Sequence, residues 1–395
     1  MPKGIYRAAR IFDGVQWHED AALRIDGGRV AGIGPAEGAP LAVPVPGWIV
    51  PGLIDLQVNG GGGVLFNNDP TLGGIARICA AHAAFGTTAT MVTLITDRPE
   101  VTAAAISAGG QADATPGFLG LHLEGPHLAV SRKGTHDPAL IRPMAEADLA
   151  ALVLAAGALP NLIVTLAPEA ASALQIGDLA AAGAVVSLGH SNCDAASARA
   201  AFAAGAGMVT HLFNAMSQLG HRAPGLVGAA LDGERIWAGL IADGFHVDDT
   251  VMRVALRAKA GAGRSGGIFL VSDAMSTIGS DQREFTLNGR RILREGGRLT
   301  LQDGTLAGAD IALIDAVRHV HRGLGLPLEE ALRLAALHPA RAMGLSDRGH
   351  LAPGARADFI AISPGVEALG TWIGGLPAAG VAQADVAQAG AGVRA

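Results

Sequence analysis

Acidic residues and histidines gather at the ends of short apolar segments of this chain. Glu124, His190 and His211 each end or closely follow such a segment. One carboxylate and two imidazoles form the three-ligand set that is typical of a catalytic divalent-metal centre with an open position for water. Each residue taken alone is more often an ordinary surface or core residue, so the prediction depends on their shared placement. The sequence therefore predicts a metal site that can activate water.

Asp273 ends another apolar segment, within the sequence FLVSDAM. A carboxylate beside a metal ion could take a proton from water and pass it to a leaving group. Asp is also a common helix N-cap, and the residues alone leave these two interpretations open. Other segment ends carry further polar side chains, namely Gln57, Asn59, His122, Glu169, Asn214, Asp243 and His246.

Eight apolar segments of this kind occur between Trp48 and Met275, separated by Ala- and Leu-rich helical stretches. They are WIVPGLIDLQV, TTATMVTLIT, GFLGLHLEG, NLIVTLAPE, AVVSLGH, GMVTHLFNA, IWAGLIADG and GIFLVSDAM. Apolar strands that alternate with helices predict a parallel sheet, and eight such units are what a closed (β/α)8 barrel requires. A doubly wound open sheet is the alternative, which the strand count disfavours. In a barrel all strands end at one mouth, so the polar residues would share a site.

Both ends of the chain predict a second, smaller unit. Gly27-Gly28 indicates a hairpin between alternating segments near the start, and GHLAPGARADFIAIS reads as strands near the other end. We therefore expect a TIM-like α/β barrel at residues 49–345 and a small β-sandwich domain formed from residues 1–48 and 346–395. The Ala- and Gly-rich stretch after Ala378 is predicted to be a poorly ordered terminus.

The composition restricts the partners of the chain. Its 395 residues include 29 basic and 35 acidic residues, with a net charge of −6 and no basic run that could neutralise a nucleic-acid backbone. No apolar stretch of about 20 residues occurs, so we expect no membrane contact and a soluble, cytoplasmic protein. Cys79 and Cys193 cannot form a disulfide framework and are predicted to be buried thiols. Aromatic residues make up only 4% of the chain, so hydrogen bonds and charges are expected to hold a polar ligand.

Other catalytic motifs do not occur in the sequence. GHSNC does not match the G-x-S-x-G nucleophile elbow, H-E-x-x-H is missing, and NGGGGVLF lacks the Gly-Lys-Ser/Thr of a P-loop. Residues 60–63 are therefore expected to form a flexible loop over the barrel mouth. Arg222 and His246 lie in predicted loops, where solvated charges are the default and a phosphate or carboxylate clamp is the alternative.

Ten motifs occur in a characteristic order between about residues 49 and 360: PGLIDLQVNG, LHLEGPHL, KGTHDP, TLAPE, SLGHSN, THLFNAM, RAPG, ADGFHVD, VSDAM and HPARAMGL. Together they resemble the N-acetylglucosamine-6-phosphate deacetylases of the amidohydrolase superfamily. The resemblance implies a metal-dependent hydrolase of amino-sugar catabolism or recycling. It would convert N-acetyl-D-glucosamine 6-phosphate, a small amino-sugar phosphate, into D-glucosamine 6-phosphate and acetate.

The resemblance also implies roles for individual residues. Glu124, His190 and His211 match the ligands of one divalent metal, and Asp273 matches the catalytic acid and base. His136 in KGTHDP matches a histidine that hydrogen-bonds the acetamide carbonyl. Residues that match contacts to the sugar phosphate are Asn214, Ala215, Arg222 and His246. In that family the arginine reaches the site of a neighbouring subunit, which implies a homodimer.

One departure from the superfamily pattern affects the expected metal content. Most members begin the barrel with His-x-His and bind two metals, whereas this chain has Gln57-Val58-Asn59, and neither Gln57 nor Asn59 is an expected ligand. We therefore expect one metal ion per subunit, zinc first and iron as the alternative. Two other functions stay open. One is a related amidohydrolase for N-acetylgalactosamine 6-phosphate or another N-acyl substrate, and the other is a barrel that binds an amino sugar without turnover.

Overall fold

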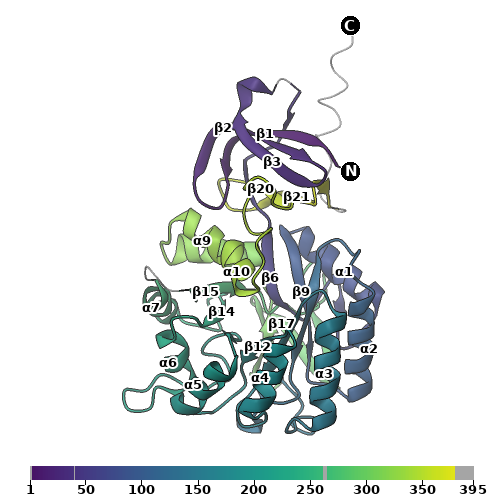
Figure 1. Ribbon diagram of the computed structural model, residues 1–395, viewed down its shortest axis with the longest axis vertical. Coiled ribbons are helices and arrows are strands. Elements are labelled where there is room, and N and C mark those ends of the chain that lie inside the picture. Colours follow the sequence, from purple (N-terminus) through teal and green to yellow (C-terminus); the bar gives the residue numbers. More distant parts are fainter. Residues whose placement is uncertain (1, 40, 261–264, 379–395) are drawn as a thin grey trace.

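A barrel of eight parallel strands forms the larger of two units in the chain, and a small sheet lies at one end of it (Figure 1). The computed structural model describes residues 2–39, 41–260 and 265–378. The barrel strands are β6 (Leu53–Val58), β9 (Thr87–Ile95), β10 (Phe118–Glu124), β11 (Leu162–Leu166), β12 (Val185–Leu188), β13 (Met208–Val209), β14 (Trp237–Ile241) and β15 (Ile268–Val271). The barrel closes beyond β15, where Asp273 N donates to Gln57 O at 3.0 Å and Val58 pairs with Ala274. This confirms the predicted (β/α)8 architecture.

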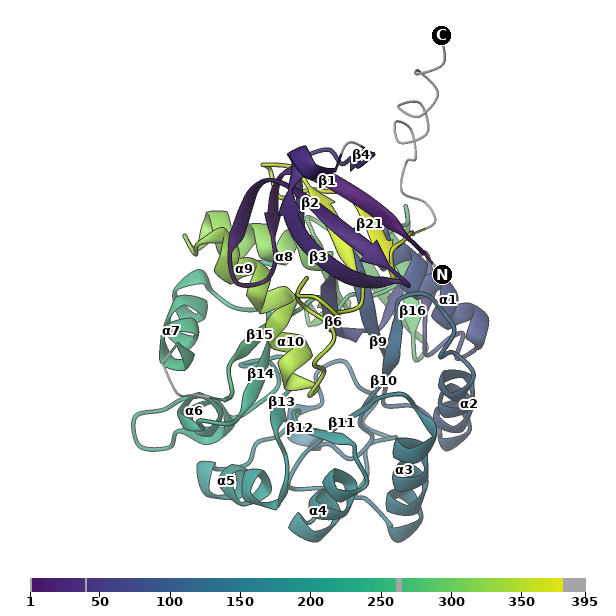
Figure 2. The same cartoon turned by 45° about the horizontal axis from the view of Figure 1, so that its top comes forward.

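Helices cover the outside of the barrel, as Figure 1 shows for most of them. They are α1 (Leu72–Ala83), α2 (Pro99–Gly110), α3 (Glu146–Ala158), α4 (Ala173–Ala181), α5 (Ala195–Ala204), α6 (Gly225–Asp232), α7 (Asp249–Lys259) and α8 (Leu313–Arg318). Two further helices, α9 (Leu328–Ala335) and α10 (Leu337–Ala342), lie between the barrel and the small sheet (Figure 2). No helix in the described ranges is long and apolar enough to cross a membrane.

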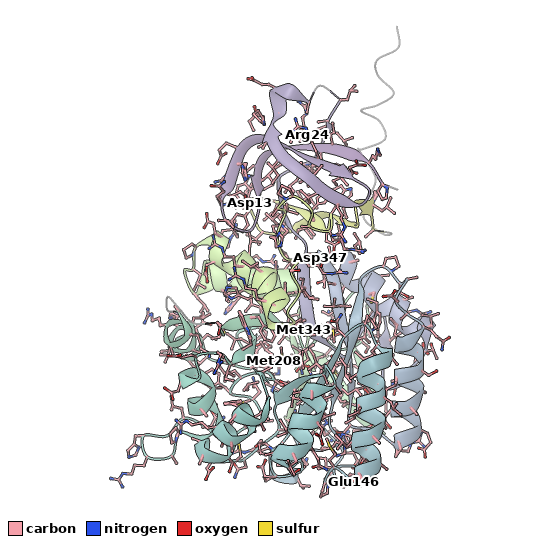
Figure 3. The ribbon with its side chains drawn as sticks, viewed as in Figure 1. Asp13, Arg24, Glu146, Met208, Met343 and Asp347 are labelled. Atoms are coloured by element: carbon pink, nitrogen blue, oxygen red, sulfur yellow. The ribbon has the colours of Figure 1, made fainter. Side chains whose placement is uncertain are left out.

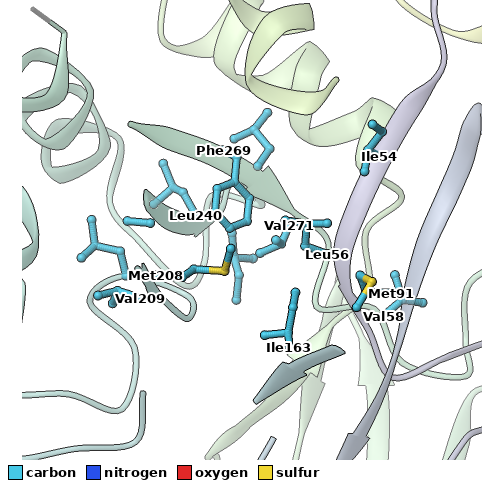
Figure 4. Close-up of a cluster of buried hydrophobic side chains, with 14 of the residues drawn as sticks. Ile54, Leu56, Val58, Met91, Ile163, Met208, Val209, Leu240, Phe269 and Val271 are labelled. Atoms are coloured by element: carbon cyan, nitrogen blue, oxygen red, sulfur yellow. The ribbon is translucent and has the colours of Figure 1, made fainter. Parts of the chain in front are cut away.

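Buried apolar side chains form the core on and around the barrel strands, because parallel strands covered by helices are buried on both faces. Leu56, Met91, Ile163 and Phe269 belong to this core (Figure 4). Figure 3 shows Asp347 near the junction with the small sheet and Glu146, the first residue of α3, at the opposite end. Since the helices run back against the strands, the strands end on the side of Glu146. The mouth of the barrel therefore faces away from the small sheet.

The first apolar segment, Trp48 to Val58, does not form one strand as the sequence suggests. Its first half is β5 (Trp48–Pro51), which pairs with strands of the small sheet, and only β6 enters the barrel. The break falls at Gly52, where a Cβ atom would lie 2.2 Å from Thr88 Oγ1. Pro51 also removes a backbone donor at this point. The small sheet therefore extends to Pro51, beyond the predicted boundary at residue 48.

The small β-domain expected from the two chain ends is present. Its strands are β1 (Gly4–Phe12), β2 (Trp17–Asp26), β3 (Arg29–Pro35), β4 (Val43–Pro44), β5, β20 (Phe359–Ile362), β21 (Ala368–Ile373) and β22 (Leu376–Pro377). They form one sheet with its own apolar cluster, which includes Leu23, Phe359 and Trp372. Gly27 and Gly28 adopt φ values of 62° and 77°, as the predicted hairpin turn requires. The predicted loose terminus at residues 379–395 lies outside the described residues.

A four-stranded antiparallel sheet follows β15, and none of the sequence patterns described above predicts it. It contains β16 (Glu284–Leu287), β17 (Arg290–Glu295), β18 (Arg298–Thr300) and β19 (Leu306–Ala309). Its apolar face, with Phe285, Ile292 and Leu299, packs on Ile95 and Met275 near the barrel mouth. The inserted sheet thus becomes a wall of the region where the strands end.

The glycine-rich residues 60–63 are not the flexible loop that the sequence suggests. They belong to a tight hairpin of β7 (Gly60–Gly61) and β8 (Val64–Leu65), all four of whose strand residues are buried. A Cβ atom at Gly60 would lie 2.4 Å from the Val64 carbonyl oxygen, and His82 Nε2 donates to Gly60 O at 2.9 Å. Close packing, rather than mobility, explains the glycines here.

Candidate active site

A cavity of 380 Å³ opens where the barrel strands end, within the usual size range of small-molecule sites. Several predicted site residues line it, namely Asn59, Glu124, His136, His190, His211, Asn214, Ala215, His246 and Asp273. They come from loops far apart in the sequence, so barrel closure brings them together. Of the other predicted residues, Gln57 contacts Glu124 from beside the cavity, and Arg222 lies outside the wall of the cavity.

Glu124, His190 and His211 present three buried ligand atoms to one another. Glu124 Oε1 lies 3.2 Å from His190 Nε2 and 3.0 Å from His211 Nε2, and the two nitrogens are 3.1 Å apart. A tetrahedral ion with bonds of about 2.0–2.1 Å requires ligand atoms about 3.3 Å apart. The observed separations are within about 0.3 Å of that requirement, so the three residues fit a small divalent cation.

The tautomer of His190 and the charge of Glu124 also suit a cation. His190 Nδ1 donates to Arg132 O at 2.8 Å, which directs the lone pair of Nε2 toward Glu124. Burial would raise the pKa of Glu124, but the adjacent imidazoles of His190 and His211 hold it well below the usual range. Burial also opposes protonation of His211, yet the hydrogen bond and charge of Glu124 raise its pKa. Nδ1 of His211 is buried and has no hydrogen-bond partner in the described part of the chain.

Asp273 is placed to exchange a proton beside this set. Asn59 Nδ2 donates to Asp273 Oδ1 at 2.7 Å and fixes the orientation of the carboxylate. Burial, followed by the negative charge of Glu124, raises the pKa of Asp273 to about 6. Such a pKa is close to neutral pH, as general acid–base catalysis requires. Asp273 does not cap a helix among those described, so the N-cap interpretation is wrong.

Gln57 and Asn59 orient the carboxylates of the site. Gln57 Nε2 donates to Glu124 Oε1 at 3.2 Å, in parallel with the contact between Asn59 and Asp273. Each amide donates a hydrogen bond, so each favours the charged form of the carboxylate that it contacts.

His136 lies beside Glu124, with its Nε2 4.0 Å from Glu124 Oε2. Its Nδ1 is 2.7 Å from Thr96 Oγ1, whereas the same hydroxyl is 3.4 Å from Glu124 O. The single hydroxyl proton of Thr96 can serve one of these two acceptors, and donation to Nδ1 is the case that puts the ring N–H of His136 at Nε2. Burial lowers the pKa of His136 well below its usual range. His136 is therefore a neutral hydrogen-bond donor.

His246 is held by an acidic neighbour on the same loop. Its Nδ1 lies 2.6 Å from Asp243 Oδ2, and both side chains are at most 7% exposed. Burial alone would raise the pKa of Asp243, but the hydrogen bond and charge of His246 lower it. Asp243 thus fixes the ring of His246, which lines the cavity.

The amidohydrolase family matches residues 48–383. The chain belongs to this family. An N-acetylgalactosamine-6-phosphate deacetylase of Shewanella sp. (strain ANA-3) is 40% identical over 90% of this chain and 91% of its own length. A human N-acetylglucosamine-6-phosphate deacetylase is 38% identical over 83% of this chain and 82% of its own length. The relatives thus include enzymes named for each of two sugar phosphates.

Solved structures of amidohydrolases extend the comparison to the whole fold. The structure of N-acetylglucosamine-6-phosphate deacetylase from Pasteurella multocida superposes with a TM-score of 0.90 at 33% identity, covering 95% of this chain and 99% of that chain. A mutant of the enzyme from Mycobacterium smegmatis, in complex with N-acetyl-D-glucosamine 6-phosphate, gives a TM-score of 0.86 at 30% identity, covering 96% of this chain and 100% of that chain.

Sequence reasoning misses several residues of this amidohydrolase site. Thr96 directly follows the second barrel strand and contacts His136, but a threonine next to an apolar strand carries no distinctive signal. Thr305, Leu306 and Gly308 of the inserted sheet line the cavity. That sheet could have been found from its turn dipeptides, Asn288-Gly289, Gly296-Gly297 and Asp303-Gly304, which separate alternating segments.

Proposed function

We propose that this amidohydrolase removes the acetyl group of N-acetyl-D-glucosamine 6-phosphate in amino-sugar catabolism. Water and the amide would give acetate and D-glucosamine 6-phosphate. The observation that carries the proposal is the joint placement of the Glu124, His190 and His211 set, Asp273 and His136 around one cavity. The names of the relatives support this choice of substrate.

Glu124, His190 and His211 would hold one divalent metal ion, with zinc expected and iron as the alternative. When bound, the ion lowers the pKa of water from about 15.7 toward about 7, which makes water a nucleophile at neutral pH. A second metal ion would need histidine or carboxylate ligands at the positions of Gln57 and Asn59. The side-chain amides of these two residues contact carboxylates instead, so we propose a single ion per subunit.

Two side chains of this chain would act on the amide. Asp273 accepts a proton from the attacking water and delivers it to the departing nitrogen, a contribution of typically about 10²–10⁴-fold. His136 donates from Nε2 to the carbonyl oxygen as negative charge develops there, and Thr96 holds it in the tautomer that can do so.

The phosphate would be bound by charges at the edge of the cavity. His246, with Asp243 behind it, supplies one such group, and Asn214 and Ala215 line the adjacent wall. Arg222 is exposed on the protruding loop before α6, away from the cavity of its own chain. We propose that Arg222 reaches the cavity of a second copy, so that a homodimer completes the phosphate site. Free, buried Cys79 and Cys193 agree with a reducing compartment, and we propose the cytoplasm.

Acetate release from N-acetyl-D-glucosamine 6-phosphate, measured together with metal content, tests the proposal. We expect one metal ion per subunit and turnover that Asp273→Asn lowers by about 10²–10⁴-fold while metal binding is retained. Near-normal turnover of metal-loaded Asp273→Asn would show that the acid and base lie elsewhere. No acetate from a folded, metal-loaded protein would favour a barrel that binds the sugar without turnover.

N-acetylgalactosamine 6-phosphate is the second candidate substrate. The Shewanella relative, at 40% identity, and a relative of Escherichia coli O157:H7, at 34%, are both named for its deacetylation. Comparison of kcat/KM for the two sugar phosphates, with the unphosphorylated N-acetyl sugars as controls, decides between them. A higher value for the galacto sugar would make it the preferred substrate. Equal values with and without phosphate would instead indicate another N-acyl substrate.

A further inference from the structure

Glu169 lies in the loop after the fourth barrel strand, yet it does not line the cavity. Its carboxylate accepts two hydrogen bonds from the next loop, one from Ser191 Oγ and one from Asn192 N, each at 2.7 Å. Both donors directly follow the metal-site residue His190. Glu169 therefore fixes the chain at the point where it leaves His190.

Asn192 continues this chain of contacts toward the cavity. Its Oδ1 accepts from both Nε and a terminal nitrogen of Arg132, at 2.9 and 2.7 Å. The carbonyl oxygen of Arg132 in turn accepts from His190 Nδ1 at 2.8 Å. Four residues, Glu169, Asn192, Arg132 and His190, thus form a closed circuit between the loops that follow β10, β11 and β12.

His190 needs such support because its backbone is strained and its ring is confined. Its φ of +47° is uncommon for a residue other than glycine and persists only where surrounding contacts hold it. Ala129 N donates to His190 O at 2.9 Å, so the loop after β10 contacts both ends of the residue. A Cβ atom at Gly134 would lie 3.2 Å from His190 Cε1.

We propose that Glu169 and Asn192 are positioning residues that act through Arg132 to hold His190 as a metal ligand. The Arg132 carbonyl fixes the tautomer and the plane of the imidazole, and the two side chains fix Arg132. Partners behind a metal ligand commonly change metal affinity about 10- to 100-fold. Glu169 and Asn192 are exposed, and Arg132 stands between them and His190. We therefore expect the change in metal affinity to be at the lower limit of this range, about 10-fold.

The test is a titration of metal-free protein with Zn²⁺ against a competing chelator, in the absence of sugar. Glu169→Ala and Asn192→Ala should each weaken Zn²⁺ binding about 10-fold. Asn192→Asp keeps the oxygen that accepts from Arg132 and should retain wild-type affinity. Glu169→Gln keeps only one of the two accepting oxygens and should bind Zn²⁺ more tightly than Glu169→Ala but more weakly than wild type. Glu100→Ala serves as the control, because Glu100 is exposed and no side-chain hydrogen bond is found for it among the described residues.

Three further measurements separate positioning from a merely structural role. The melting temperature of the metal-free variants should equal that of metal-free wild type, and excess Zn²⁺ should restore kcat. The double variant Glu169→Ala/Asn192→Ala should bind Zn²⁺ no more weakly than the weaker single variant, since both substitutions break one circuit. Unchanged affinity in the single variants, or an additive loss in the double variant, would overturn the proposal.

If the alanine variants fail to fold, Arg132→Met tests the same link, because it removes only the half-exposed guanidinium. Weaker Zn²⁺ binding is expected, and unchanged binding would again overturn the proposal. The inference rests on the metal site of the proposed function but not on its substrate. A protein that binds Zn²⁺ through this circuit and releases no acetate would refute the substrate assignment alone.

Discussion

Replacement of Thr96 by valine tests whether His136 must be held in one tautomer. The Thr96 hydroxyl lies 2.7 Å from His136 Nδ1, and both side chains are buried. Valine keeps the shape of threonine but removes its hydroxyl group. The variant should fold and bind metal, yet Nδ1 would lose its donor and Nε2 would no longer be kept as the protonated nitrogen.

The magnitude follows from the cost of an unpaired buried group. Removal of one partner of a buried hydrogen bond costs about 1–3 kcal/mol. If this cost falls on the transition state, kcat decreases about 5- to 150-fold, at 1.36 kcal/mol for each factor of ten. Loss of an oxyanion donor altogether costs about 10²–10³-fold, so His136→Ala should be more damaging than Thr96→Val.

Steady-state acetate release from metal-loaded variants is the assay. Thr90→Val is a matched control on the strand that precedes Thr96, because the Thr90 hydroxyl is buried and has no hydrogen-bond partner in the described structure. It should leave kcat unchanged. In a His136→Ala background, Thr96→Val should cause no further loss. An equal loss in that background, or a raised KM with normal kcat, would show that Thr96 does not act through His136.

Four other outcomes are expected. Burial and the charge of Glu124 raise the pKa of Asp273 to about 6, and a bound cation would lower it again, so kcat/KM should fall as the pH drops through a pKa no higher than about 6. An acidic limb centred above pH 7 would contradict this assignment. Arg222→Ala should raise KM for phosphorylated sugars and leave unphosphorylated ones unaffected; an equal effect on both would exclude a phosphate contact. Chelation should lower the melting temperature and abolish turnover, and added Zn²⁺ should reverse both, since a ligand of the folded state stabilises it. Burial lowers the pKa of His82 from 6.5 to about 4, so the folded state resists a proton that the unfolded chain accepts. Stability in urea should therefore decrease by about 3 kcal/mol as the pH falls from 6.5 to 4, and His82→Gln should flatten this decrease.

The sequence predicts those parts of the fold that depend on a local pattern. Apolar segments with helices between them gave the eight barrel strands, because a strand buried on both faces must be apolar along its length. The polar residues at strand ends gave the candidate site, because a closed barrel brings those ends together. Glu124 and His211 are an example, since 87 residues separate them in the chain and 3.0 Å in space.

Features that depend on contacts between distant segments could not be predicted in the same way. The division of Trp48–Val58 between two sheets falls at Gly52, which Thr88 approaches closely. The Pro51-Gly52 dipeptide is a local signal for a break, but the local sequence does not show that each half joins a different sheet. The role of Thr96 depends on the tautomer of a histidine 40 residues away. The opposite error concerns residues 60–63. The run of glycines suggests a mobile loop, whereas close packing against His82 and Val64 explains why glycines are present there.

The strained backbone of the site links features that the local sequence predicts with features that depend on distant contacts. His190, His211 and Asp273 have φ values of +47°, +30° and +50°, and such conformations cost about 1–3 kcal/mol each. The sequence gives no sign of this strain, because histidine and aspartate also occur in relaxed backbone. Only the surrounding hydrogen bonds, such as those from Asn59 to Asp273 and from His190 to Arg132, can maintain it. Asparagine tolerates the left-handed region as well as aspartate does, so Asp273→Asn should change the chemistry of the site while leaving its backbone in place.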